Sequence, residues 1–504
     1  MNIAQAKEQI EYAMKAYFTK NEFGDYKIPV EKQRPVFLMG PPGIGKTAIM
    51  EQIASELGVG LVSYSMTHHT RQSALGLPYI TDQEFEGAHY QLSQYTMSEI
   101  IGAIYQLMKE TGIREGILFL DEINCVSETL APCMLQFLQY KVFGQHRIPK
   151  GWIVVTAGNP PEYNKSVRDF DIVTWDRLKR IDVEADYETW KQYAAQKQIH
   201  PAILTYLAAR KKDFYLVEST VDGRHFVTAR GWEDLSEMMK LYEENGISAD
   251  ELLIGQYIQH EKIAKDFSIY YDLFRKYQSD YQIDSILNGT SGEDILFRAK
   301  HAPMDERLSF LGLLFDAITS VLKEVCQMED ALDGLMQVLK EIRKEILEKP
   351  GITEQLEQKI SEEMEALERG RKASTLSREK QICLQGVITA LQNNKMQLMM
   401  EHSMDDESGY AMMKRAFEKS VSELKEKAQK AGEKLEHAFT FCEEAFGEGD
   451  EILIFVTELT ANYDTARYIG HYGCEKYDLH NKELQFAQRQ IELEKKVKEL
   501  DWTL

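Results

Sequence analysis

Eight consecutive residues near the amino terminus have the types and spacing of a phosphate-binding loop. The segment GPPGIGKT follows the apolar run VFLM and precedes a helical pattern. Its glycines let backbone N–H groups curl around phosphates, the Lys46 ammonium reaches the β and γ oxygens, and the Thr47 hydroxyl can bind magnesium. We therefore expect ATP and magnesium as ligands, and expect the nucleotide to be bound by Gly40, Pro41, Pro42, Gly43, Ile44, Gly45, Lys46, Thr47 and Ala48.

A pair of carboxylates, Asp121 and Glu122, follows the apolar run ILFL. At the carboxyl end of a buried strand, Asp121 can hold magnesium through its water shell. Glu122 is placed to orient and deprotonate an attacking water. The pair therefore predicts ATP hydrolysis as well as binding; the alternative is a surface Asp-Glu turn after a core strand.

A polar side chain also follows the apolar run WIVVTA, where Asn159 precedes two prolines. If that strand lies between the other two, Asn159 can hydrogen-bond the lytic water or the γ-phosphate. An Asn-Pro pair by itself marks only a turn, so this interpretation depends on the order of the motifs.

Two arginine regions complete the candidate site. Arg168, Arg177 and Arg180 precede the expected fifth strand, and an arginine there can neutralise charge on the transferring phosphoryl group, also from a neighbouring subunit. Arg177 is the first choice for this finger and Arg168 the second, against surface ion pairing. In TARGWEDLS, Arg230 begins a helix behind a threonine cap, from which it could contact the γ-phosphate.

The elements that must position these residues alternate short apolar runs with helical segments. This rhythm is typical of βαβ units and predicts an α/β P-loop fold with a parallel sheet covered on both faces. The expected strands are Val36–Met39, Leu61–Ser65, Ile117–Leu120, Trp152–Ala157 and Ile181–Val183.

The rest of the chain reads as helical. Ten of the twelve prolines lie in the first 201 residues, and the last 154 residues have none. We expect a nucleotide-binding core at 1–185, a helical lid at 186–265 and an all-α region at 266–504. Heptad spacing predicts coiled coils at 321–346 and 417–442, or equally the packed helices of an ordinary bundle.

Composition excludes several classes of protein. No window approaches the roughly 18 apolar residues of a membrane span, and the amino terminus lacks the apolar core of a secretion signal. The six cysteines include no Cys-x-x-Cys pair, so we expect reduced thiols and a cytoplasmic protein. A net charge of −22 opposes a nucleic-acid partner, because duplex binding relies on Lys and Arg to displace phosphate counterions.

Taken together, GPPGIGKT, ILFLDE, TAGN and TARGWEDLS resemble the Walker A, Walker B, sensor 1 and sensor 2 motifs of AAA+ ATPases. HHTRQSALGLPYI, TLAPCMLQFLQYKVFGQHRIPKGW and NPPEYNKSVRDFD followed by WDRL resemble more narrowly the MoxR-like branch. The resemblance covers about residues 10–265. The finger segment is the least standard motif, so Arg168 and Arg177 could exchange roles, and Arg230 could act in cis or in trans.

The resemblance implies a five-stranded parallel sheet in the order 5-1-4-3-2, a helical lid and assembly into a ring, usually a hexamer. It also implies a β-hairpin near the second strand, at 77–92, that lines a central pore. Many MoxR-like ATPases remodel a partner that carries a von Willebrand factor A domain. Within KVFGQHR, Phe143, His146 and Arg147 could form a second pore-facing or interface loop, or an ordinary hairpin between helix and strand.

The leading hypothesis is therefore a ring-forming ATPase that remodels or activates a protein partner. One alternative is a motor subunit of a nucleic-acid-processing, restriction-type complex, which would need a basic face on the helical half. Another is a nucleotide-gated oligomeric scaffold with little turnover. The adjacent His68 and His69 point to opposite faces if they lie on a strand, so we expect structural or hydrogen-bonding roles for them.

Overall fold

The computed structural model describes residues 1–85, 87–164, 166–168, 170–220, 223–348, 351–400, 405–447 and 449–482. These residues form two compact units, each described below by itself. The first unit holds Met1–Thr189, Thr228–Arg230 and Ser361–Gln381. The second holds Trp190–Val227, Gly231–Ile360 and the chain from Ile382 to the last described residue. The three-part division at 185 and 265 stays a prediction.

The first unit is built on a five-stranded parallel sheet with the order β2-β5-β8-β1-β9. The α/β class, the parallel sheet and the order 5-1-4-3-2 are thereby confirmed. Because β8 lies between β1 and β5, the residue after β8 is placed between the two carboxyl ends that carry the loop and the acidic pair. The strands are β1 (Val36–Met39), β2 (Gly60–Ser65), β5 (Gly116–Asp121), β8 (Trp152–Gly158) and β9 (Lys179–Asp182).

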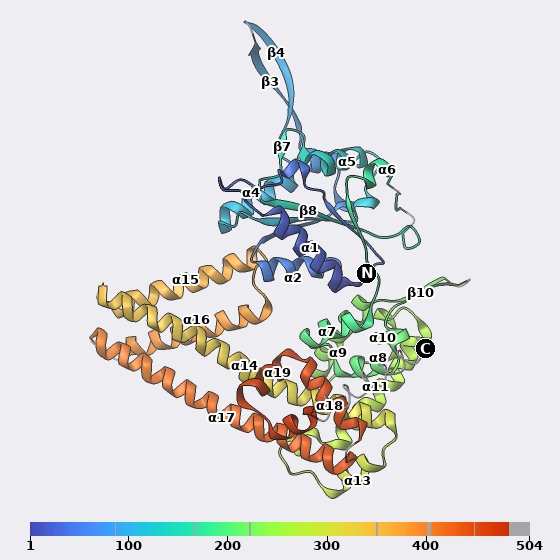
Figure 1. The fold of residues 1–504 in the computed structure, drawn as a ribbon, viewed down its shortest axis with the longest axis vertical. Helices are drawn as coiled ribbons and strands as arrows, with labels where there is room; N and C mark the ends of the chain where they lie inside the picture. Colours follow the sequence, from blue (N-terminus) through green and yellow to red (C-terminus); the bar gives the residue numbers. More distant parts are fainter. Residues whose placement is uncertain are drawn as a thin grey trace, which may run out of the picture. The chain divides into compact units, whose positions relative to one another are not determined.

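Helices cover both faces of this sheet, which explains why its central strands are apolar throughout rather than alternating. Leu118 and Leu120 of β5 belong to a core that also contains Ile104 of α4 and Phe137 of α5. The helix α2 contacts β2 and β5 and packs against α1 (Figure 1). These helices are α1 (Ile3–Tyr17), α2 (Ala48–Leu57), α4 (Glu99–Thr111) and α5 (Ala131–Tyr140), with α3 (Arg71–Leu75) and α6 (Ile172–Trp175) in the connections.

Two antiparallel hairpins interrupt the βαβ pattern of the first unit. The longer one pairs β3 (Pro78–Phe85) with β4 (Ala88–Tyr95) and extends as a ribbon away from the sheet of this unit (Figure 1). Compared with the expected segment 77–92, its strands begin one residue later, at Pro78, and end three residues later, at Tyr95. The shorter one pairs β6 (Val142–Phe143) with β7 (His146–Arg147) before β8 begins.

A distant segment of the chain completes the core of the first unit. The helix α15 (Ile352–Lys372) ends at a turn, and α16 (Arg378–Met400) begins after it. Ala373 in this turn is fully buried and belongs to the same apolar core as Leu118. A residue from the helical half of the chain therefore contributes to the apolar core that packs on the sheet. Nothing in the sequence indicated this contribution.

The second unit is almost entirely helical. In the described parts of both units, the helices lack the length and apolar character that a membrane span requires. Its β10–β11 hairpin, Leu216–Thr220 with Gly223–Val227, was not expected. The helices are α7 (Tyr187–Gln196), α8 (Pro201–Ala209), α9 (Ala229–Glu244), α10 (Glu251–Tyr257), α11 (Glu261–Tyr281), α12 (Ile283–Leu287), α13 (Glu293–His301), α14 (Met304–Glu348), α17 (Asp406–Phe446), α18 (Asp450–Ala461) and α19 (Tyr463–Tyr472).

Two long helices organise this unit. The 45 residues of α14 and the 41 residues of α17 pack against each other and contain the two heptad stretches (Figure 1). Near Phe310 the helix α14 belongs to a core that includes Leu435 of α17 and Phe455 of α18. Further along, Leu339 packs in a second core that includes Leu391 of α16. The same two helices thus take part in a bundle along their whole length, and a freestanding coiled coil stays a prediction.

Candidate nucleotide-binding site

The loop between β1 and α2 has a backbone that only glycine accommodates well. Gly43 and Gly45 have φ angles of 72° and 92°, in the left-handed region. A Cβ atom added at Gly43 would lie 2.8 Å from Cβ of Thr228, and one added at Gly40 would lie 2.6 Å from the Val183 carbonyl oxygen. The glycine spacing therefore follows from local geometry, and the loop keeps the open curve that backbone contacts to phosphate require.

Lys46 is buried within this loop and makes three hydrogen bonds. Its Nζ donates to the carbonyl oxygens of Gly40 and Pro41, each over 2.8 Å, and to Oδ1 of Asn159 over 2.9 Å. The pKa of Lys46 is lowered to about 8, mainly by burial and also by the charge of Arg230, while the charges of Asp121 and Glu122 oppose this shift. The ammonium is therefore held in place by neutral oxygens, which a phosphate could replace with a stronger, charged partner.

Thr47 and Asp121, the two residues expected to hold magnesium, are direct neighbours. Oγ1 of Thr47 donates to Oδ2 of Asp121 over 3.2 Å, while Oδ1 of Asp121 accepts from the backbone N–H of Glu122 over 2.8 Å. Magnesium prefers hard oxygen ligands and keeps part of its water shell. A hydroxyl and a carboxylate at this distance, beside the phosphate-binding loop, fit that coordination. The donor set present thus suits a Mg²⁺–ATP complex.

Glu122 is held by two hydroxyl groups, one at the end of the neighbouring strand β2 and one in the turn that follows it. Its Oε2 accepts hydrogen bonds from Oγ of Ser65 and from Oγ1 of Thr67, each over 3.1 Å. The backbone of Glu122 is left-handed, with φ of 55°, so its side chain leaves the chain in a different direction from that of Asp121. Ser65 is paired in register with Asp121, a relationship that only the alignment of β2 with β5 reveals.

Asn124 connects the acidic pair with the strand end at β8. Its side-chain Nδ2 donates to the carbonyl oxygen of Asn159 over 2.8 Å, and its own carbonyl accepts from the backbone N–H of Arg168 over 2.9 Å. Only 2% of Asn124 is exposed, and a Cβ at Gly158 would lie 2.5 Å from its Oδ1. Asn124 thus fixes the backbone from which Asn159 reaches Lys46, and no periodic pattern in the sequence points to this residue.

Arg230 is the one arginine of the four that the chain brings to the loop by itself. Its backbone N–H donates to the Gly43 carbonyl oxygen over 3.2 Å, and its guanidinium charge acts on Lys46. Thr228, just before it, lies against Gly43. The start of α9 therefore belongs to the candidate site.

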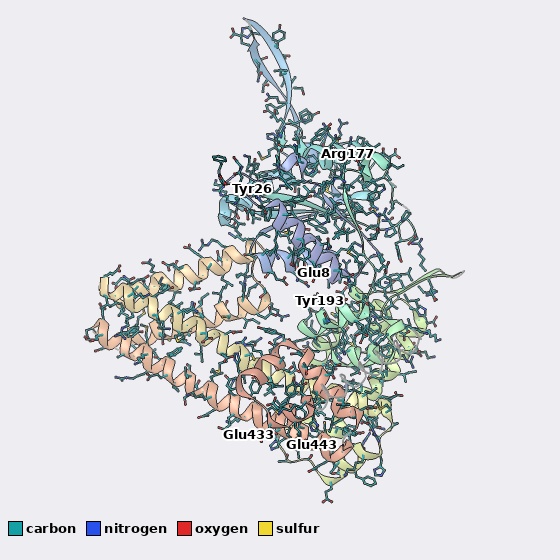
Figure 2. The ribbon with its side chains drawn as sticks, in the orientation of Figure 1. Glu8, Tyr26, Arg177, Tyr193, Glu433 and Glu443 are labelled. Carbon is teal, nitrogen blue, oxygen red and sulfur yellow. The ribbon has the colours of Figure 1, made fainter. Side chains whose placement is uncertain are left out.

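The other three arginines have partners of their own. Arg168 forms an ion pair with Glu128 at 3.0 Å, and Arg180 with Asp182 at 2.8 Å. Arg177 is exposed on the α6 side of the first unit and donates from Nη1 to Oε1 of Gln139 over 2.8 Å (Figure 2). Within one chain, these three contacts direct the guanidinium groups to residues other than those of the phosphate-binding loop.

Two further expectations concern aromatic and histidine side chains. Phe143 is fully buried and stacks on Phe137 at 3.9 Å between ring centroids, so a pore-facing role for this residue is wrong, and its side chain anchors the β6–β7 hairpin in the core. A pore-facing or interface role for His146 and Arg147 stays a prediction. His69 contacts Oγ of Ser73 over 3.1 Å, a hydrogen-bonding role as expected.

The order and geometry of these motifs agree with a comparison against known families. Residues 36–164 match the model of the ATPase family associated with various cellular activities, AAA. The match covers β1 with its loop, β5 with its acidic pair and β8 with Asn159, and it supports an AAA+ ATPase domain and nucleotide binding in this part of the chain. A search of curated proteins finds no match.

Proposed function

We propose that this chain is a MoxR-like AAA+ ATPase that hydrolyses ATP in a ring assembly in order to remodel a protein partner. The observation that supports it most is the convergence of four predicted residues on one loop: Lys46 bonds Asn159, and Thr47 bonds Asp121. The AAA match over 36–164 supports the coarser statement, an AAA+ ATPase. The branch, the ring and the partner are parts of the proposal.

In this proposal the phosphates bind to the backbone N–H groups of Gly40–Thr47 and to the Lys46 ammonium. Thr47 and Asp121 hold magnesium, which, when bound, neutralises charge on the β and γ oxygens and orients them. Lys46 exchanges its bonds to the Gly40 and Pro41 carbonyls for phosphate oxygens. Because Asn159 already touches Lys46, its amide is placed next to the γ-phosphate position.

Glu122 is the proposed general base. Its carboxylate takes the proton of the attacking water, and before that it must be released from Ser65 and Thr67. Arg230 acts at the γ-phosphate from the start of α9, in cis or in trans. Arg177, exposed on the surface of one chain, is the proposed finger for the neighbouring subunit's nucleotide, with Arg168 as second choice.

The partner is proposed from the branch: a protein that carries a von Willebrand factor A domain. The β3–β4 hairpin supports the branch assignment, since it follows β2 at the position where the resemblance places an insertion. In a ring it would line the central pore. Its exposed apolar side chains, Tyr79, Ile80, Tyr90 and Leu92, would contact the client there.

The assembly is tested by light scattering of purified Glu122→Gln protein with and without ATP. We expect ATP to shift the mass from that of a single chain to a closed oligomer, and a Lys46→Met variant to stay unshifted. The ATP-loaded Glu122→Gln ring then serves as bait, and a von Willebrand A protein is the expected capture. A mass that does not respond to ATP in Glu122→Gln would contradict ring assembly driven by this site.

A further inference from the structure

The second unit contains a cavity of about 840 Å³ that has no part in the nucleotide site. It lies among α7, α8, α9, α11, α14 and α18, all of which contribute lining residues. Its volume is within the range of pockets that hold small organic ligands. Much of the wall is apolar, with Leu204, Phe274, Leu311, Phe315 and Phe455 among the lining side chains.

Two polar groups on α14 lack protein partners in this cavity. The Thr319 hydroxyl is buried, the residue being 9% exposed, and its Oγ1 makes no hydrogen bond with the described residues. Asp316 lies one helical turn earlier on the same face, and its carboxylate makes no hydrogen bond or ion pair within the described part of the chain. A buried hydroxyl without a partner is costly, so a ligand that pairs with it gains affinity.

Several other charged groups of the wall are paired with each other. Glu243 accepts hydrogen bonds from Nε2 of His200 over 3.1 Å and from the Tyr271 hydroxyl over 2.6 Å. Lys191 forms an ion pair with Glu458. Asp316 as a residue is exposed to solvent. The protein packed around its carboxyl nevertheless raises the pKa of that group by desolvation; Glu243 adds to this effect, and His200 and Lys240 oppose it. The Asp316 carboxylate and the Thr319 hydroxyl can therefore accept hydrogen bonds from a ligand, and acidic and apolar side chains surround them.

We propose that this cavity binds an organic ammonium ion that carries an apolar chain. The ammonium donates to the Asp316 carboxylate and to Oγ1 of Thr319, and the chain packs along the Leu311 and Phe274 side chains. A charge-assisted hydrogen bond to Asp316 gives the selectivity for a cation. The same chemistry occurs in a free aliphatic amine and in the lysine side chain of a protein partner.

Isothermal titration calorimetry on the full chain, without nucleotide, tests this site independently of ATP turnover. The probe is hexylammonium, and 1-hexanol of the same chain length is the uncharged comparison. We expect hexylammonium to bind saturably, hexanol to bind at least about tenfold more weakly, and Asp316→Asn to lose about tenfold in affinity for the amine. Asp284→Asn removes a different lining carboxylate and serves as the matched control, with affinity unchanged.

Thr319→Val keeps the volume and removes the hydroxyl, so it provides a second variant should Asp316→Asn not fold. It should weaken the amine by about threefold or more. A leucine-flanked lysine peptide and its acetylated form then separate the two sources. Tighter binding of the unmodified peptide than of hexylammonium assigns a partner's lysine, and the reverse order assigns a free amine. Equal affinity for hexanol and hexylammonium, or amine affinity unchanged in Asp316→Asn, would overturn the proposal.

Discussion

Thr67 donates a hydrogen bond from its Oγ1 to Oε2 of Glu122 over 3.1 Å. Ser65 donates to the same oxygen over the same distance. The carboxylate proposed to activate water is therefore tied to the end of β2. Hydrogen bonds to a charged group are worth about 1.5–3 kcal/mol each, so this arrangement restrains the proposed base before catalysis.

Removing both hydroxyls should release Glu122. We expect the Ser65→Ala, Thr67→Val double variant to raise basal ATP turnover by a few-fold, because the carboxylate no longer has to leave two donors to reach the water. Steady-state phosphate release at saturating ATP measures this. Ser63→Ala, on the exposed face of the same strand, is the matched control and should leave the rate unchanged. A lower rate in the double variant would mean that the two hydroxyls support catalysis instead of restraining it.

Lys46 predicts a pH dependence of ATP affinity. Burial places its pKa at about 8, below the usual 10.5, so the ammonium is lost as the pH rises through about 8. Below that value it is charged in both the nucleotide-free protein and the complex. ATP affinity should therefore be flat in this group below pH 8 and fall by up to about tenfold per unit above it.

A fluorescent ATP analogue titrated between about pH 7 and pH 9.5 measures this fall. Lys46→Met lacks the titrating group and should bind weakly, with little change over the same range. ATP affinity that is constant above pH 8 would place the charged group elsewhere.

The lowered pKa of Lys46 also affects stability. The unfolded chain keeps this proton up to about 10.5, so the free energy of unfolding should rise with pH between about 8 and 10.5 in the nucleotide-free protein.

Asp121 predicts how turnover depends on magnesium. Asp121→Asn removes the carboxylate charge while keeping a group of similar size beside Thr47. The Mg²⁺ concentration for half-maximal turnover should rise by about tenfold, and a chelator should stop turnover in the parent protein. Titration of Mg²⁺ at fixed ATP gives the value. Asp82→Asn, on the β3–β4 hairpin, is the control. An unchanged magnesium requirement in Asp121→Asn would exclude it from the metal site.

The sheet could be predicted because its signals are local. Three apolar runs of four to six residues, each followed by a residue that can do chemistry, indicate buried parallel strands and the edge at which Lys46, Asp121 and Asn159 lie. The strand order itself came from a family resemblance, and β8 between β1 and β5 agrees with it.

The residues that the sequence analysis did not identify act through contacts between segments that are far apart in the sequence. Ser65 and Thr67 matter because β2 pairs with β5 in a register that puts Ser65 opposite Asp121, and no spacing in the sequence encodes that register. Asn124 acts on a carbonyl 35 positions away, and Ala373 reaches the core from the helical half. The Asp316–Thr319 pair was invisible for another reason. It reads as polar positions on one helix, and only the packing of α8, α11 and α18 around α14 encloses it.

ATP turnover by the Glu122→Gln variant tests the central claim most directly. The change keeps the size and the hydrogen-bonding oxygen of the side chain and removes its ability to take a proton. We predict that the parent protein releases phosphate in the presence of Mg²⁺, and that Glu122→Gln binds ATP as tightly while its turnover falls by at least about a hundredfold. Glu122→Gln protein that turns over ATP at the parent rate would contradict the account.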